Sequence, residues 1–544
     1  MRIPVGRREQ PTRLLSSPWW RGAAVLAAGA LPALAFPAPG LWWLAYIGLV
    51  PWLLLIRTAP TGRRALLDGW LGGFGLVLAV HHWLVPNLHV FILLLSALLG
   101  LLWAPWGWLV RLMLGGTPSP ARAAAAVAVV PSGWLMVELV RSWEGLGGPW
   151  GLLGASQWEV PPALRLASVG GVWLVSLLVA AVNTAVTVLL AVPSARVPAV
   201  AALCVCAVAA GSVWVWAPRP ARHGDVVRVA VVQPGVINGV GGAERRFARS
   251  EELTRQLAGQ DVDLVVWGES SVGMDLAARR DLTARISALS RAVGAGVLVN
   301  VDARRPDRPG SSPGGTGGRI FKSSVLVGPD GPIGDRYDKM RLVPFGEYVP
   351  ARALLGWATS VGKAAGEDRM RGTRQVVMAV PGDRPGSGLR VGPLVCFESA
   401  FPDMSRRLVR SGAELLVAQS ATSTFQDSWA PAQHASLAAL RAAETGRPMV
   451  HATLTGESAV YGPRGEPLGE RLGTGTSAAA VHEIPLAGGT TPYVRLGDWP
   501  VYGALAVLAA LCAAEGLRSL RRPAPGTPAR PSRTAHGSAV RPGR

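Results

Sequence analysis

The chain has 544 residues, of which 49% are hydrophobic and 16% charged, and its mean hydropathy is +0.30. These values argue against an ordinary water-soluble enzyme. The net charge of +20 does not identify a nucleic-acid-binding protein either, because much of the positive excess lies near the chain ends and in short loops, where arginines orient a protein in a membrane.

Residues 22–217 form a nearly continuous series of apolar segments, and a helix needs about 20 apolar residues to cross a bilayer. We expect about eight spans, seven in this region and one near the C-terminus. Their expected positions are 22–36, 39–56, 66–86, 90–113, 123–141, 166–191, 197–216 and 499–517. The first segment is short, contains Pro32 and ends in an Ala-Leu-Ala sequence, so a cleaved signal peptide is the alternative there.

Arginines are concentrated before the first expected span, after the second and the fourth, and in the tail at 518–544. Because cytoplasmic segments retain basic residues, these regions are expected inside the cell. The basic N-terminus at 1–21 and the tail would then be cytoplasmic, and residues 226–486 would lie on the outer face of the cell membrane. The tail is rich in Pro, Ala, Gly, Ser and Arg, a composition that predicts disorder.

Residues 226–486 read as a mixed, water-soluble domain in which short apolar runs alternate with amphipathic stretches. We expect strands at 226–235, 262–271 and 296–301, helices at 244–259 and 281–294, and hairpin turns at 328–331 and 462–466. This alternation predicts an α/β sandwich of layered sheets with outer helices.

Only one of the four cysteines, Cys396, lies in this domain; Cys204, Cys206 and Cys512 fall in expected spans. A disulfide within the domain and a cysteine-based metal cluster are therefore excluded. Cys396 is then a buried structural thiol or a nucleophile, and the cysteine alone favours the structural interpretation.

Two further polar residues stand at or beyond the ends of apolar strands, Glu269 in "WGES" and Lys339 in "YDKMRLVPFGEYVP". A thiol needs a base or a nearby cation to become a nucleophile at neutral pH. A carboxylate can accept the thiol proton, and an ammonium group can stabilise the oxyanion of a tetrahedral intermediate. Glu269, Lys339 and Cys396 therefore have complementary roles for acyl transfer.

The order Glu, Lys, Cys resembles the nitrilase superfamily. The strings "YDKMRLVPFGEYVP" and "CFESAFP", in a chain with many apolar spans, resemble the apolipoprotein N-acyltransferases, the membrane-embedded family of that superfamily. The shorter strings "WGES" and "AETGRP" are weaker signals. This resemblance covers most of the chain and implies an exported nitrilase-like domain with an αββα arrangement at 226–486.

The resemblance also implies a reaction. Cys396 would take an acyl chain from a membrane phospholipid as a thioester and pass it to the N-terminal amine of a diacylated lipoprotein. Glu269 would be the general base and Lys339 the electrostatic stabiliser, and Tyr337, Glu347, Phe397 and Glu398 would have supporting or substrate-binding roles. No metal, nucleotide or other cofactor is expected, and the chain is expected to act as a monomer in the membrane.

The sequence departs from the family pattern in two places. Gly268 precedes Glu269 where the family typically has proline, a change that glycine's backbone freedom is expected to tolerate. Ala421, Thr422 and Thr424 stand in a segment where the family usually has Asn-Asp-x-Trp, so substrate contacts are expected to differ. This altered segment keeps a non-enzymatic alternative open, a membrane platform for a lipid-linked glycosyltransferase; the other alternative is a membrane-tethered amide hydrolase.

Two features next to these motifs have structural and functional interpretations. The apolar segment at 348–362 is either a lid that dips toward lipid or a packed surface helix. His434 falls on an expected helix that ends at Gly446, and we expect it to line the helix or the surface without pairing with Cys396.

Overall fold

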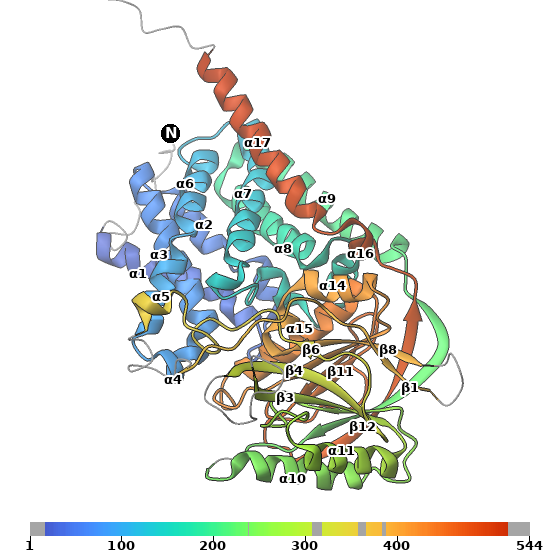
Figure 1. Cartoon of the computed structure of the whole chain (residues 1–544). Helices are drawn as coiled ribbons and strands as arrows, with labels where there is room; N and C mark the ends of the chain where they lie inside the picture. The colour runs from blue at the N-terminus through green and yellow to red at the C-terminus, as the bar shows by residue number, and fades with distance from the viewer. Residues whose placement is uncertain (1–16, 238, 307–317, 357–365, 383–387, 521–544) are drawn as a thin grey trace, which may run out of the picture.

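The computed structural model describes residues 17–237, 239–306, 318–356, 366–382 and 388–520, which form a helical domain and an α/β domain (Figure 1). The helices of the helical domain are α1 (Pro18–Ala30), α2 (Val50–Arg57), α3 (Gly62–His81), α4 (Val85–Leu88), α5 (Phe91–Gly100), α6 (Trp103–Leu114), α7 (Pro120–Arg141), α8 (Pro161–Ala191) and α9 (Arg196–Trp216). The last helix of the chain, α17 (Trp499–Leu520), returns to pack against α7 and α8.

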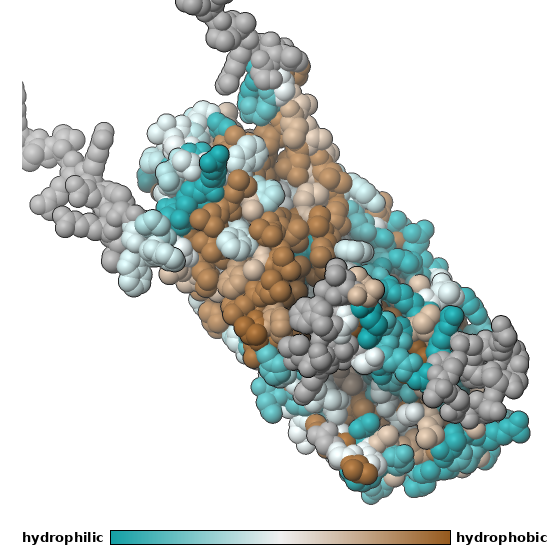
Figure 2. Space-filling view, turned by 60° about the vertical axis from the view of Figure 1, so that its left-hand side comes forward, coloured by the Kyte–Doolittle hydropathy of each residue, from teal (hydrophilic) through white to brown (hydrophobic). Residues whose placement is uncertain are grey.

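Five helices among the described residues are long and apolar enough to cross a membrane: Gly62–Leu88, Pro120–Arg141, Pro161–Ala191, Pro193–Trp216 and Trp499–Arg518. The pair Phe91–Gly100 and Trp103–Leu114, bent by 41°, makes a sixth if it is one span. Apolar residues accordingly gather over this domain, and hydrophilic residues gather over the α/β domain (Figure 2).

These six helices correspond to six of the eight expected segments, and the first two segments are shorter. Helix α1 has 13 residues and passes into a 3₁₀ turn, Leu31–Ala35, that contains Pro32. The second segment is an apolar helix of less than spanning length, Trp42–Arg57. Proline removes a backbone donor and ends a regular helix, which explains the early end of α1.

The α/β domain contains two sheets. The strands are β1 (Ala221–Gln233), β2 (Leu264–Trp267), β3 (Gly296–Pro306), β4 (Gly318–Gly328), β5 (Gly331–Pro332), β6 (Tyr337–Asp338), β7 (Met378–Val380), β8 (Leu389–Val395), β9 (Leu415–Ser420), β10 (Met449–Thr453), β11 (Ala459–Tyr461) and β12 (Ala478–Gly488). The larger sheet has the order β12-β1-β2-β3-β4-β5, with β6 paired to β4, and the smaller one has the order β11-β10-β9-β8-β7. In the described residues, β1, β2 and β3 run parallel in one sheet and β8, β9 and β10 in the other.

The sheets pack face to face between two layers of helices, as the sequence predicts. The helices are α10 (Gly242–Arg255), α11 (Arg280–Val293), α12 (Arg352–Leu355), α14 (Pro402–Arg410), α15 (Ala430–Thr445) and α16 (Pro492–Leu496). Helices α10 and α11 cover the outer face of the larger sheet, far from the helical domain, whereas α14 and α15 lie between the smaller sheet and that domain (Figure 1).

The expected strands and helices of the α/β domain are confirmed, and so are both hairpin turns. Gly328 pairs with Gly331 in the first turn, and Gly462 donates a backbone hydrogen bond to Glu466 in the second. The predicted helix that carries His434 is α15, which ends at Gly446 in the left-handed region. Part of the proposed lid at 348–362 and most of the predicted disordered tail lie outside the described residues.

One apolar core joins the helical domain to the inner helix layer of the α/β domain. The cluster includes Trp134 on α7, Val175 on α8, Leu408 on α14 and Leu437 on α15, all buried. Polar contacts reinforce this junction: Val172 donates its backbone N–H to Glu444 over 2.7 Å. Because burial of apolar surface is the main favourable term in folding, the two domains stabilise each other and hold a fixed geometry.

Gly148, in the loop after α7, lies at this junction. Its φ is +67°, and a Cβ there would lie 2.6 Å from the ring of Phe397 and 2.7 Å from the ring of Phe401. Gly147 has a φ of +94° but no atom within 4 Å of an added Cβ. Gly147 and Gly148 therefore share a strained backbone conformation, but only Gly147 has room for an added Cβ.

We therefore expect Gly148→Ala to lower the unfolding temperature and the activity more than Gly147→Ala. Both variants pay about 1–2 kcal/mol for a positive φ, and Gly148→Ala adds about 1–3 kcal/mol of overpacking against the two rings. Thermal unfolding in detergent measures the difference. Equal losses would show that the loop does not press against Phe397.

Candidate active site

Three predicted residues come together from the ends of three strands. Glu269 follows β2, Lys339 follows β6 and Cys396 follows β8. The Lys339 Nζ lies 3.3 Å from Glu269 Oε1, and the Cys396 thiol lies near enough to the Glu269 carboxylate to help lower its pKa. Lys339 is fully buried and Glu269 nearly so. The carboxyl ends of parallel strands from both sheets meet here, which explains how residues far apart in sequence converge.

The backbone of Cys396 is held in an uncommon conformation. Its φ is +51°, where strand β8 changes into the 3₁₀ helix Cys396–Ala400. Its carbonyl oxygen accepts a hydrogen bond from Ser399 Oγ at 2.9 Å and lies 3.1 Å from His434 Nε2. A non-glycine residue in the left-handed region costs about 1–2 kcal/mol, and such strain clusters at functional sites.

His434 lies on α15 as expected, and it is buried. Its contact with Cys396 is to the backbone carbonyl oxygen and not to the thiol, which agrees with the expectation that the two side chains do not form a catalytic pair. The contact is to the backbone carbonyl, where a neutral ring N–H can donate. Burial lowers the pKa of His434 to about 4, which keeps the ring uncharged near neutral pH.

The electrostatics of the site favour a protonated thiol beside an ionised carboxylate. Burial raises the pKa of Cys396, and the nearby negative charge of Glu269 raises it further. Lys339 opposes both effects, and the pKa of Cys396 is about 12. Burial would also raise the pKa of Glu269, but the charges of Lys322 and Lys339 outweigh burial and lower it to about 2. The resting site therefore holds a base next to a proton that it can accept.

Glu347 fixes the position of Lys339. Its Oε1 lies 2.8 Å from Lys339 Nζ, and its Oε2 accepts the backbone N–H of Val343 at 2.9 Å. Burial would lower the pKa of Lys339, but the charges of Glu269 and Glu347 raise it well above its usual value. Lys339 is therefore a permanent cation between two carboxylates.

Glu398 ties the Lys339 loop to the cysteine strand. Its carboxylate accepts backbone N–H groups from Met340 at 2.7 Å, Arg341 at 3.0 Å and Val395 at 2.8 Å. The Tyr337 hydroxyl lies 2.8 Å from both of its oxygens. Glu398 and Tyr337 are fully buried, and these hydrogen bonds set the relative position of Lys339 and Cys396.

Phe397 faces the helical domain. Its ring meets Phe401 edge-on, with centroids 4.9 Å apart, and lies against Gly148. Because Phe397 directly follows Cys396 in the chain, these contacts connect the cysteine to the junction between the two domains.

Sequence reasoning missed one charged residue of the site, Lys322 on β4. Its Nζ lies 2.8 Å from Glu269 Oε1 and 3.5 Å from Glu347 Oε1. A compositional signal was available, because only three of the chain's 54 lysines and arginines are lysines: Lys322, Lys339 and Lys363. In a chain this rich in arginine, a lysine within an apolar strand indicates a need for a compact ammonium group.

The two departures from the family pattern have different structural settings. A Cβ on Gly268 would lie 1.9 Å from the backbone nitrogen of Leu454, so the position requires glycine and not merely tolerates it. In the altered segment, the backbone N–H and the hydroxyl of Thr422 both donate to the Thr455 carbonyl. The ring of Phe425 meets Trp83 of the helical domain at 4.9 Å. The Thr422 hydrogen bonds tie the loop after β9 to the loop after β10.

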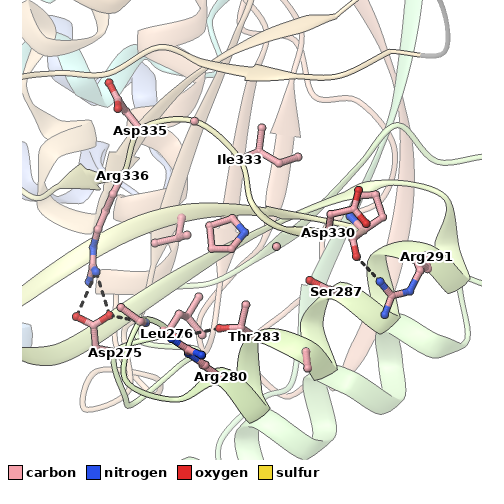
Figure 3. Close-up of a pocket in the computed structure, with 17 residues that line it drawn as sticks. Asp275, Leu276, Arg280, Thr283, Ser287, Arg291, Asp330, Ile333, Asp335 and Arg336 are labelled. Carbon is pink, nitrogen blue, oxygen red and sulfur yellow. Dashed lines mark hydrogen bonds and ion pairs between the residues drawn. The ribbon is translucent and has the colours of Figure 1, made fainter. Parts of the chain in front are cut away.

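The cavity shown in Figure 3 does not belong to the site around Cys396. It has a volume of about 700 Å³ between α11 and the turn that joins β4 to β5, and Arg336 and Asp275 pair at one end of it. None of the seven predicted site residues lines it. In the described part of the chain, no group of three or more His, Cys, Asp or Glu residues could hold a metal ion.

Comparison with known proteins identifies the family. The sequence profile described as the apolipoprotein N-acyltransferase N-terminal domain matches residues 28–185, and the carbon-nitrogen hydrolase profile matches residues 228–491. An apolipoprotein N-acyltransferase from Azotobacter vinelandii is 32% identical over 522 residues, covering 91% of this chain and 95% of that protein. The chain belongs to the apolipoprotein N-acyltransferase family.

A second member of this family, from Pseudomonas aeruginosa, is 30% identical over 519 residues, which cover 91% of this chain and 96% of that protein. A solved amidase from Nesterenkonia sp. is 19% identical, with a TM-score of 0.32, and the match covers 49% of this chain and 92% of that one. The carbon-nitrogen hydrolase match and the two packed sheets confirm the nitrilase-like α/β fold of this apolipoprotein N-acyltransferase family member.

We expect Gly268→Ala to abolish most activity, because the added Cβ would push the loop that carries Glu269 away from Leu454. A displacement of about 1 Å at a catalytic group can cost about 100-fold in rate. Gly268→Pro, which restores the residue typical of the family, carries a Cβ too and should fail equally.

Gly273→Ala is the matched control, because its added Cβ would meet only Ala243 at 3.5 Å. Activity and unfolding temperature of the purified variants test the expectation. A Gly268→Pro variant with normal activity would show that the close approach to Leu454 is not required.

Replacement of Glu398 should separate Lys339 from Cys396. In Glu398→Gln, an amide N–H would face one of the backbone donors, and the loss of hydrogen bonds to a charged group costs about 1.5–3 kcal/mol. We expect activity to fall by about 10- to 100-fold.

Tyr337→Phe removes a single hydroxyl and should have a smaller effect than Glu398→Gln. Glu414→Gln is the control, since Glu414 also accepts a backbone N–H, from Arg390 at 3.0 Å, but at the start of β9. Activity measurements rank the three variants. A Glu398→Gln enzyme as active as Glu414→Gln would contradict the positioning role.

Proposed function

We propose that this chain transfers an acyl chain from a membrane phospholipid, through a thioester on Cys396, to the N-terminal amine of a diacylated lipoprotein. The observation that carries the proposal is the convergence of Glu269 and Lys339 on one partly buried thiol with a strained backbone, in a member of the apolipoprotein N-acyltransferase family.

In the first half-reaction, the Cys396 sulfur attacks the ester carbonyl of the phospholipid while the thiol proton passes to Glu269. A carbon–sulfur bond forms, and the carbonyl oxygen becomes an oxyanion that Lys339 stabilises. Lys339 has three N–H donors, of which Glu269 and Glu347 take two, so one remains for the oxyanion. Collapse of the intermediate breaks the carbon–oxygen bond, and Glu269 returns the proton to the departing lysophospholipid oxygen.

In the second half-reaction, the lipoprotein amine attacks the thioester and gives a proton to Glu269. A carbon–nitrogen bond forms, the carbon–sulfur bond breaks, and Glu269 reprotonates the Cys396 thiolate. The product is an amide, and the site returns to its resting state. Tyr337, Glu347, Phe397 and Glu398 support these steps by holding the three reacting groups in place.

Both proposed substrates are held in a bilayer, and the architecture fits that constraint. The α/β domain is joined through a common core to helices apolar enough to span a membrane, so the site would meet both substrates at high local concentration. We further propose the finer topology: eight crossings, a cytoplasmic N-terminus at 1–21, a membrane domain at 22–217, an exported catalytic domain at 226–486 and a cytoplasmic tail after the span at 499–517. The protein would act as a monomer in the cell membrane.

Incubation of the purified protein with phospholipid carrying a labelled acyl chain tests the thioester. We expect the wild type to acquire label that neutral hydroxylamine removes, and we expect Cys396→Ala and Lys339→Met to acquire none. A variant in which Cys204, Cys206 and Cys512 are all alanine should label normally, because these thiols lie in apolar helices away from the site.

Added diacylated lipopeptide should then remove the label and appear as the N-acylated product. Release of free fatty acid without N-acylated lipopeptide would favour the amide-hydrolase alternative. A folded wild type that never acquires label would contradict the proposed reaction.

The proposed topology makes a separate prediction. A cysteine at exposed Asp330, in a background without native cysteines, should react with a membrane-impermeant maleimide in intact spheroplasts. A cysteine at exposed Thr117, between α6 and α7, should react only after the membrane is opened. The reverse pattern would place the catalytic domain inside the cell.

A further inference from the structure

Lys322 provides the shortest ion pair to the proposed base. Its Nζ lies 2.8 Å from Glu269 Oε1, whereas the Nζ of Lys339 lies 3.3 Å from the same atom. Lys339 is nearer to Glu347, at 2.8 Å. Each lysine therefore makes its shorter ion pair with a different carboxylate: Lys322 pairs mainly with Glu269, and Lys339 pairs mainly with Glu347.

Other groups keep Lys322 in this position. Its Nζ lies 3.2 Å from Ser270 Oγ and 3.7 Å from Asp302 Oδ2, and its side chain is 13% exposed. Asp302 pairs in turn with Arg369 at 3.2 Å, so that carboxylate is balanced by its own cation. Strand β4 is held by its long antiparallel pairing with β3, so the lysine is carried on a rigid element.

Four charged groups then make up the buried cluster: Glu269, Glu347, Lys322 and Lys339. With both lysines charged, the cluster is neutral when the carboxylates are ionised. Without Lys322, the remaining cluster of two ionised carboxylates and one charged lysine would carry one net negative charge. A negative cluster would oppose the oxyanion that the reaction must form, because charge interactions are strong in a buried site.

We propose that Lys322 is a second essential cation of the site, a positioning residue that aims Glu269 at Cys396, keeps it ionised, and leaves Lys339 free to serve the oxyanion. This inference deepens the proposed function and rests on Glu269 acting as the base in that reaction. Lys322 acts through Glu269 and is not itself in contact with the thiol.

The proposal has a pH consequence. Glu269 is faced by Lys322 from β4, Lys339 from the loop after β6, Cys396 from the end of β8 and His434 from α15. A cation next to a carboxylate lowers the pKa of that carboxylate by about one to three pH units. Lys322 makes the shortest ion pair to Glu269, so its loss should raise the pKa of Glu269 by an amount near the upper end of this range. Because Glu269 must be ionised to accept the proton, activity is lost as the pH falls through this pKa. The pH at which activity is lost on the acidic side of the pH–activity profile should therefore rise from near pH 2 toward about pH 5 when the charge of Lys322 is removed.

Two charge-removing variants and one charge-keeping variant test this. Lys322→Met keeps the approximate length, Lys322→Gln keeps a hydrogen-bond donor, and Lys322→Arg keeps the charge. Arg319→Met, at an exposed position on the same strand, removes an equal charge elsewhere. The first readout is the ratio of self-acylation rates at pH 4 and pH 7 with labelled phospholipid.

The second readout is alkylation of Cys396 by iodoacetamide at the same two pH values, followed by mass spectrometry of the peptide that contains it. It needs neither phospholipid nor lipoprotein, so it tests Lys322 even if the proposed acyl transfer fails in the first readout. We expect the pH 4 to pH 7 ratio to fall by at least about threefold in Lys322→Met and Lys322→Gln, and to be unchanged in Arg319→Met.

Lys322→Arg should keep the wild-type ratio even if its overall rate falls, because the charge remains. Unchanged ratios in both neutral variants would overturn the proposal. Equal losses at the two pH values in Lys322→Met, Lys322→Gln and Lys322→Arg would also overturn it, because they would show that Lys322 only maintains the packing of β4.

Discussion

The buried cluster of two carboxylates and two ammonium groups around Cys396 is the interaction on which the site depends. A charge buried alone costs several kcal/mol, so each member needs the others. The 2.8 Å pairs Lys322–Glu269 and Lys339–Glu347 satisfy this need, and they leave the Glu269 carboxylate next to the thiol. The cluster is assembled entirely from the α/β domain, from β4 and the segments after β2, β6 and β8. The same pairing that makes the cluster stable holds together the groups that we propose as base, nucleophile and stabilising cation.

The helical domain contributes by fixing the geometry of this cluster and by bringing it to lipid. The apolar core passes without interruption from α7 and α8 into α14 and α15, and the residue next to Cys396, Phe397, lies against the loop at Gly148. A change in the membrane-side loop can therefore reach the cysteine through one aromatic contact. A soluble relative of the same fold would need neither this junction nor the exposed apolar helices around it, which gather on one part of the surface (Figure 2).

Much of this arrangement was predictable from the sequence, and the exceptions have physical causes. The strand and helix pattern of residues 226–301 was readable because hydrophobic periodicity is strong there. Lys339 and Cys396 could be recognised from longer motifs, and Glu269 from its place at the end of an apolar strand. Lys322 was missed because a lone lysine in a strand resembles a solvated edge residue, and its partners lie 53 and 25 positions away. The requirement for Gly268 was missed because it arises from the backbone of Leu454, a contact that local sequence does not encode. The early end of α1 was not predictable, because composition alone does not show that the helix gives way to a 3₁₀ turn after 13 residues.

In the resting site, Glu269 is ionised beside a protonated Cys396, and infrared spectroscopy can detect the protonation state of this carboxyl group. Difference spectra between pH 7 and pH 4, compared for the wild type and Glu269→Gln, isolate the carboxyl signal of this one residue. The account predicts no protonation of Glu269 over this interval, because its pKa is lowered to about 2. A protonated-carboxyl band that grows in with a midpoint at or above the ordinary glutamate value of about 4.3, and that is missing from Glu269→Gln, would contradict it.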